Sequence, residues 1–149
     1  MRTSRAQRGD PMSTSSSGAR MAKPALDVGL VTADAQPLID FYAGVAGFDV
    51  LDPLELPNIG TIHKLGCGES ILRIMVPVDP PARDPSASFS ATAGIRYLTL
   101  EVDDIEAAAA AVERLGGSVA LPPFELRPGR RVAQVADPEG NMIELGQDG

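Results

Sequence analysis

Four side chains with useful chemistry occupy matched positions in the two halves of this sequence. Asp27 and Arg73 belong to the first half, and Tyr97 and Glu144 belong to the second. A guanidinium and a carboxylate form a bidentate and strongly oriented pair. We therefore expect Arg73 to lie between Asp27 and Glu144, with the Tyr97 hydroxyl nearby. An arginine held in this way can anchor an anionic or carbonyl oxygen of a ligand, while a carboxylate acts as hydrogen-bond acceptor or base.

The two halves are copies of one pattern. Residues 27–34 lead directly into a helical pattern at 35–48, and residues 97–104 lead into another at 105–117. Each opening motif ends in an aspartate, Asp34 in the first copy and Asp104 in the second. Arg73 follows Asp34 by 39 positions, and Glu144 follows Asp104 by 40. A tandem βαβββ repeat predicts an α+β fold, in which two modules form a curved mixed sheet around a shared cavity. Matched side chains then converge on its concave face.

Hydrophobic periodicity and turn residues place the elements of each module. The first module, residues 25–77, is expected to hold a helix at 36–46 and strands at 26–33, 48–53, 60–66 and 70–77. The second module, residues 95–147, is expected to hold a helix at 104–115 and strands at 95–102, 118–121, 131–136 and 141–146. A Pro- and Ser-rich linker at 78–94 joins the two modules.

Local signals mark where these elements begin and end. Asp34 is expected to cap the first helix, and Gly47 is expected to end it. The pair Gly68–Glu69 predicts a hairpin turn between two strands. Pro122 and Pro123 predict a loop after the strand at 118–121.

Charge is distributed unevenly along the chain. The 149 residues carry a formal net charge of −7, but residues 1–23 hold five basic side chains and one acidic side chain. This Ser- and Gly-rich stretch is expected to be a disordered basic tail, with a transit peptide or a downstream start at Met12 or Met21 as alternatives. Residues 24–149 form a single expected domain with a net charge of −11. Such an acidic domain argues against nucleic acid as a partner.

Cys67 is the single cysteine, so a disulfide within the chain and a Cys-based zinc cage are both excluded. The sequence has no apolar run of transmembrane length, so no membrane partner is expected. The N-terminal stretch lacks the apolar segment of a secretory signal. The expected compartment is therefore the cytoplasm.

The sequence resembles a known family in three stretches. They are DVGLVTADAQPLIDFYAGVAGFDV from Asp27, YLTLEVDDIEAAAAAVERLGG from Tyr97, and VADPEGNMIEL from Val135. Together they are similar to the vicinal oxygen chelate superfamily, which includes glyoxalase I, methylmalonyl-CoA epimerase, extradiol dioxygenases and bleomycin-resistance proteins. The resemblance spans about residues 25–147 and implies the glyoxalase-like fold and a homodimer.

The resemblance also implies four positions that hold a divalent metal in many members. Here these positions carry Asp27, Arg73, Tyr97 and Glu144, and Glu144 alone matches the usual ligands. Arg73 has no lone pair to give, and Tyr97 is a poor ligand. We therefore expect no cofactor, with a metal on Asp27 and Glu144 completed by water as the alternative. A further alternative is an Asp27–Arg73–Glu144 network that is purely structural.

Other side chains are expected to line the same cavity and contact the substrate. These are His63, Met75, Thr99, Glu101 and Met142. The two methionines and the histidine have an alternative role as ordinary core or strand residues. Arg130 and Arg131 are expected at a solvated hairpin tip, with a contact to CoA or phosphate as the alternative.

Three functions remain open. The first is a lyase- or isomerase-type enzyme that acts on a small carbonyl or acyl compound, with Arg73 stabilising an oxyanion. The second is a small-molecule binding protein of the bleomycin-resistance type, although aromatic residues make up only 4% of the chain and offer little stacking surface. The third is a structural or regulatory module. Each of the three functions implies that the fold holds a small-molecule site or a site that once held a ligand.

Overall fold

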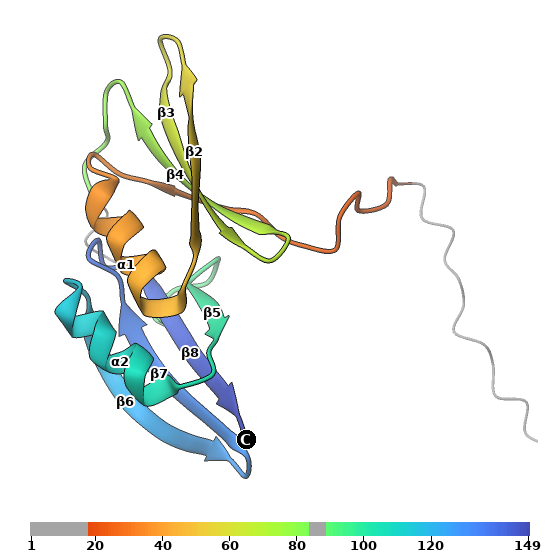
Figure 1. Ribbon diagram of the computed structural model, residues 1–149, viewed down its shortest axis with the longest axis vertical. Coiled ribbons are helices and arrows are strands. Elements are labelled where there is room, and N and C mark those ends of the chain that lie inside the picture. Colours follow the sequence, from red (N-terminus) through yellow and green to blue (C-terminus); the bar gives the residue numbers. More distant parts are fainter. Residues whose placement is uncertain (1–17, 84–88) are drawn as a thin grey trace, which may run out of the picture.

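The computed structural model describes residues 18–83 and 89–149, which form two βαβββ modules (Figure 1). Module one consists of β1 Val28–Val31, α1 Gln36–Ala46, β2 Asp49–Leu56, β3 Gly60–Cys67 and β4 Ser70–Pro77. Module two consists of β5 Tyr97–Glu101, α2 Ile105–Arg114, β6 Ser118–Arg127, β7 Arg130–Ala136 and β8 Met142–Asp148. The α+β class and the repeat are confirmed.

Each module builds its own mixed sheet. The strand orders are β1-β4-β3-β2 and β5-β8-β7-β6. The first strand of each module runs parallel to the last, and the other neighbours are antiparallel. The predicted curved sheet is thus two four-stranded sheets, and no ladder between β1 and β5 joins them within the described part of the chain.

The helix of module one follows its sequence signals closely. Leu38, Phe41 and Tyr42 are fully buried on the apolar face of α1. Gly47 ends the helix in the left-handed region at φ 70°, where its N–H donates to the Ala43 carbonyl. The N-cap is Ala35 rather than the expected Asp34, whose carboxylate instead accepts from the N–H of Gln36 at 3.1 Å.

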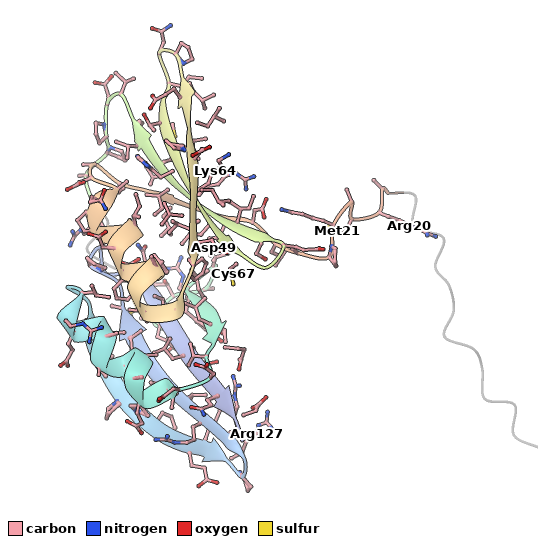
Figure 2. All side chains as sticks on the ribbon, viewed as in Figure 1. Arg20, Met21, Asp49, Lys64, Cys67 and Arg127 are labelled. Carbon is pink, nitrogen blue, oxygen red and sulfur yellow. The ribbon has the colours of Figure 1, made fainter. Side chains whose placement is uncertain are left out.

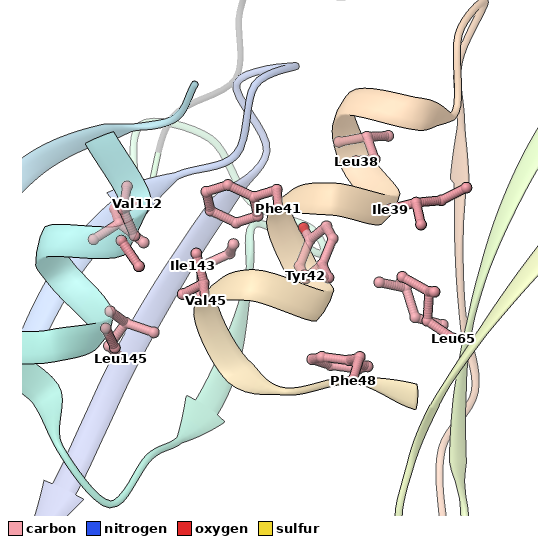
Figure 3. Packing of buried hydrophobic residues seen from close by; sticks show 14 of the residues in the cluster. Leu38, Ile39, Phe41, Tyr42, Val45, Phe48, Leu65, Val112, Ile143 and Leu145 are labelled. Carbon is pink, nitrogen blue, oxygen red and sulfur yellow. The ribbon is translucent and has the colours of Figure 1, made fainter. Parts of the chain in front are cut away.

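One hydrophobic core, on the helix side of both sheets, joins the modules (Figure 3). The helices α1 and α2 contact each other there. Gly117 permits a close approach, because a β-carbon at this position would lie 2.6 Å from the Phe41 ring. The largest fully buried side chains come from both modules: Leu38, Phe41, Tyr42, Leu65, Ile74, Ile105, Val112, Val135, Ile143 and Leu145. Neither of the two described helices, α1 and α2, covers the opposite face of its sheet (Figure 1).

Strand β6 differs from its prediction. It runs from Ser118 to Arg127 through Pro122 and Pro123, where a loop was expected. The reason is its position, because β6 is an edge strand and its pairing with β7 shifts register three times. A proline lacks the N–H of a ladder bond, and an edge strand with bulges tolerates that loss.

The two expected irregular segments fall partly outside the described residues. Of the predicted tail at 1–23, residues 1–17 lie outside them, and residues 18–23 form neither helix nor strand. Of the predicted linker at 78–94, residues 84–88 lie outside them, and its remaining residues are irregular. Among the described residues, no helix is long and apolar enough to cross a membrane.

Candidate functional site

Strand register determines which side chains face away from the core. On β4, Leu72 and Ile74 are buried, so Arg73 and Met75 lie on the opposite side, which we call the open face. On β8 of module two, Ile143 and Leu145 are buried in the core, so the side chains that alternate with them lie on the open face of that module. The predicted residues on that face are Tyr97, Thr99, Glu101, Met142 and Glu144, which pair across β5 and β8.

The predicted placement of His63 is wrong. His63 pairs with Ile74 in the β3–β4 ladder, so both side chains lie on the helix side of the sheet. The residue of β3 that pairs with Arg73 is Lys64. The structure therefore places a lysine, rather than a histidine, beside Arg73 on the open face of module one.

On module one, two cations share the carboxylate of Asp27. Its Oδ2 accepts from Nη1 of Arg73 at 2.7 Å, and its Oδ1 accepts from Nζ of Lys23 at 2.7 Å and from the N–H of Ile71 at 2.9 Å. The hydrogen bond from Lys23, followed by those from Arg73 and Ile71, holds the pKa of Asp27 far below its usual range. Asp27 is consequently a fixed anion that orients Arg73, and it is poorly suited to act as a general base.

On module two, Arg130 organises the acidic residues. Its Nη1 and Nη2 donate to the two oxygens of Glu101 at 2.6 and 2.7 Å, and Nη1 also donates to Asp148 at 3.2 Å. Nη2 lies 3.8 Å from Oε1 of Glu144, which also accepts from Thr99 at 3.5 Å. The paired guanidinium lowers the pKa of Glu101, and Glu101 and Asp148 raise the pKa of Arg130.

Arg130 thus corrects the expectation of a solvated hairpin tip. Its side chain is only 12% exposed, and it covers Gly146, where a β-carbon would meet Nη2 at 2.2 Å. The neighbouring Arg131 lies on the helix side and pairs with Glu106 of α2. The sequence signal that could have found Arg130 is Gly146, because a glycine inside a strand indicates that another group approaches closely.

The expected Asp27–Arg73–Glu144 network is therefore wrong for the single chain. Arg73 pairs with Asp27, while the cation nearest to Glu144 in the recorded ion pairs is Arg130. The network is divided into two clusters, one on the open face of each module. Module one presents a basic excess, and module two presents an acidic excess.

A cavity of about 590 Å³ lies between the first strands of the two modules. Tyr97 and Met142 line it, and the Tyr97 ring stacks on Phe89 with 4.0 Å between centroids. At one end, Oε1 of Glu139 accepts a 2.6 Å hydrogen bond from the Thr32 hydroxyl. The full lining comes from residues 28–33, 81–83 and 95–98, together with Glu139, Asn141 and Met142.

Gly29 connects this cavity with Arg73. It lines the cavity and is the direct register partner of Arg73 in the parallel β1–β4 pair. A β-carbon added to Gly29 would meet no described atom within 4 Å. The space over Gly29 is thus open, whereas the space over Gly146 is filled by Arg130. Arg73 itself is not among the residues that line the cavity.

The residues at the four metal-ligand positions do not fit a divalent cation. Both oxygens of Asp27 already accept hydrogen bonds, and Arg73 brings a positive charge to within 2.7 Å of one of them. Glu144 lies in the other cluster, close to Arg130. No group of three or more His, Cys, Asp or Glu side chains suited to a metal occurs in residues 18–83 and 89–149. An arginine in place of a ligand also repels the ion.

The fold and these matched positions define a class of protein. The chain matches the model of the Glyoxalase/Bleomycin resistance protein/Dioxygenase superfamily over residues 25–145, and it belongs to this superfamily. This confirms the resemblance seen in the sequence. Among curated proteins, none matches the chain significantly.

Solved structures show the same fold. A glyoxalase family protein from Bacillus cereus has a TM-score of 0.70 at 15% identity, with 87% of this chain and 99% of that chain covered. Glyoxalase I from Zea mays has a TM-score of 0.68 at 22% identity, with 82% of this chain and 43% of that chain covered. The trypanothione-dependent glyoxalase I of Leishmania major has a TM-score of 0.63 at 22% identity, with 86% of each chain covered.

Proposed function

We propose that this protein is a cytoplasmic, metal-independent enzyme of the lyase or isomerase type, acting on a small carbonyl or acyl compound. The observation that carries this proposal is the oriented guanidinium of Arg73. Asp27 accepts its hydrogen bond at 2.7 Å, and the Arg73 side chain is 39% exposed. The register partner of Arg73 is Gly29, which lines the cavity and has open space over it. A fixed cation next to a cavity can stabilise negative charge that develops on a carbonyl oxygen.

The other site residues take separate roles in this proposal. Glu144 is the acceptor or base, because Asp27 is held as an anion by Lys23 and Arg73. Thr99 orients Glu144 through its hydroxyl. Tyr97 and Met142 form the cavity wall on module two, where the tyrosine hydroxyl is the available neutral donor.

The protein is also proposed to act as a homodimer. Large apolar side chains are exposed on the open faces, including Leu54, Tyr97 and Phe124. A second copy would bury them, and the basic excess of module one complements the acidic excess of module two. We expect a molar mass of two chains by light scattering after size-exclusion chromatography. A monomer at micromolar concentration would contradict this part.

Turnover without metal is the direct test of the enzyme. Small aldehydes, hydroxy-ketones and acyl thioesters would be screened with the wild-type protein in excess chelator, and any active compound would be tested again with Arg73→Met. We expect activity that the chelator leaves unchanged and that Arg73→Met reduces at least a hundredfold, with an unchanged far-UV circular dichroism spectrum. Activity that requires an added divalent ion would contradict the proposal.

A binding protein of the bleomycin-resistance type is the second candidate. It is favoured by the commitment of Asp27 and Glu101 to ion pairs, which leaves few free bases near the cavity. This candidate predicts saturable ligand binding that depends on Arg73 but no turnover of the bound compound.

A further inference from the structure

Two rows of side chains cross the open face of module one. The first, which we call the Arg73 row, contains Lys64 of β3, Arg73 of β4 and Gly29 of β1 in direct register. The second, which we call the Met75 row, contains the register partners two residues further along: Ile62, Met75 and Val31. The first row is basic with an open end, and the second is entirely apolar.

Positive side chains at the Arg73 row outnumber the carboxylates that form ion pairs with them. Arg73 shares Asp27 with Lys23, so one anion serves two cations. Lys64, labelled on β3 in Figure 2, forms no hydrogen bond or ion pair with any residue that the structure describes. This excess stands out because the whole chain has a net charge of −7.

The space for a ligand lies at the other end of the row. Gly29 is exposed, and no described atom lies within 4 Å of a β-carbon built on it. Val31, which follows on the same face, is 57% exposed. Consecutive rows on a strand are about 7 Å apart, which is the reach of a hydrocarbon tail of about five carbons.

Building on the proposed small-molecule site, we propose that this surface binds the carboxylate of a small amphiphilic acid. The carboxylate lies over Gly29 against Arg73, with Lys64 supplying the second positive charge from the adjacent strand. The hydrocarbon part lies along the Met75 row toward the cavity between the modules. Planar guanidinium donors match the two oxygens of a carboxylate, which favours this head group. The substrate class of the site is therefore a short-chain organic acid or its acyl derivative with a free carboxylate.

Three six-carbon probes test the charge preference. Hexanoate, 1-hexanol and hexylammonium would be titrated into the ¹⁵N-labelled full-length protein at low ionic strength, with dissociation constants taken from amide shifts. We expect hexanoate to bind at least tenfold more tightly than 1-hexanol, with shifts centred on Gly29 and Arg73. Hexylammonium is expected to bind more weakly than either. Added salt should weaken hexanoate binding and leave 1-hexanol binding nearly unchanged.

Three variants place the probe in the proposed position. Lys64→Met should weaken hexanoate about tenfold, the effect of one charge-assisted contact, and leave 1-hexanol unchanged. Gly29→Val should abolish binding of both probes without unfolding the protein, because the space is open and valine suits a strand. The matched control is Arg131→Gln, because Arg131 is 41% exposed, is also in an ion pair and lies on the helix side.

The outcomes separate this inference from the proposed function. If 1-hexanol binds at Gly29 as tightly as hexanoate, or if Lys64→Met leaves hexanoate binding unchanged, the carboxylate site is refuted while the small-molecule site survives. If hexanoate binds as described but no carbonyl or acyl compound turns over, the carboxylate site stands and the enzyme is refuted. If the Gly29→Val variant still binds hexanoate, the proposed location of the carboxylate site over Gly29 is refuted.

Discussion

The hydroxyl of Tyr42 on α1 donates a 2.7 Å hydrogen bond to Oδ2 of Asp137, 95 residues away in the turn between β7 and β8. Both residues are buried. The same carboxylate accepts from the N–H groups of Glu139 and Asn141, so it also shapes the turn that carries Glu139 to the cavity. The Asp-Pro-Glu-Gly-Asn motif is therefore a link between the modules as well as a turn.

This link predicts an alkaline loss of stability. Burial, followed by the negative charge of Asp137 and the hydrogen bond to it, raises the pKa of Tyr42 well above 10.0. A raised folded-state pKa gives a contribution that is complete below the unfolded pKa and is lost as pH rises above it. Urea unfolding from pH 8 to pH 11 should show the free energy of unfolding falling above about pH 10. Tyr42→Phe should make that decline shallower and should lower stability at pH 8 by about 1–2 kcal/mol.

Substitution by alanine should have opposite effects on stability at two glycines that lie in strands. Gly146→Ala places a β-carbon against the Arg130 guanidinium and should destabilise the protein by about 1–3 kcal/mol. Gly29→Ala meets open space and should stabilise the protein by about 0.5 kcal/mol, because alanine restricts the unfolded chain. Chemical denaturation of both variants against wild type checks this pair. Equal effects would contradict the arrangement of Arg130 over Gly146.

Asp27 predicts an acid-side dependence. Lys23, then Arg73 and the Ile71 N–H, lower its pKa from the ordinary 3.8. A lowered folded-state pKa stabilises the protein above the unfolded pKa and ceases to do so as pH falls below it. Melting temperatures measured from pH 7 to pH 2 should fall more steeply below about pH 4 for wild type than for Asp27→Asn. Parallel curves would show that the Lys23–Asp27–Arg73 cluster does not form in solution.

Metal binding is expected to be absent at the four family positions. Purified protein dialysed against Ni, Mn, Zn or Mg and then against buffer should retain substoichiometric metal in elemental analysis. The reason is chemical, because Arg73 cannot donate a lone pair and both Asp27 oxygens are already engaged. One metal per chain that is lost in Asp27→Ala would contradict the Arg73-centred site.

The sequence predicted the elements whose signals are local. The helix at 36–46 was located to the residue, because its apolar face, Pro37 and Gly47 all agree. The strand at 70–77 was also correct to the residue. The fold followed from the repeat, since two equal patterns require two equal modules. The loop predicted at Pro122 and Pro123 was wrong. A strand accepts these prolines only because β6 lies at the edge of its sheet, and strand order is a tertiary property.

The site was predicted less well, since it depends on register. The Gly68–Glu69 turn predicted from the sequence already fixes Cys67 opposite Ser70, and counting back puts His63 opposite Ile74. His63 could therefore have been assigned to the helix side from the sequence. Arg130 could not have been assigned by counting, because its partner strand is joined by a longer turn. Gly146 indicates that some group approaches β8 closely, but which arginine of the pair fills that space follows only from the fold.

The absence of a ladder between β1 and β5 in the described part of the chain has a mechanical consequence. Every ladder bond of the described chain lies within one module, so the distance between β1 and β5 is set by side-chain contacts alone. The shared core and the Tyr42–Asp137 bond connect the modules on the helix side, and the Thr32–Glu139 bond connects them at the cavity. A change in the width of the cavity would therefore break no ladder hydrogen bond of the described strands.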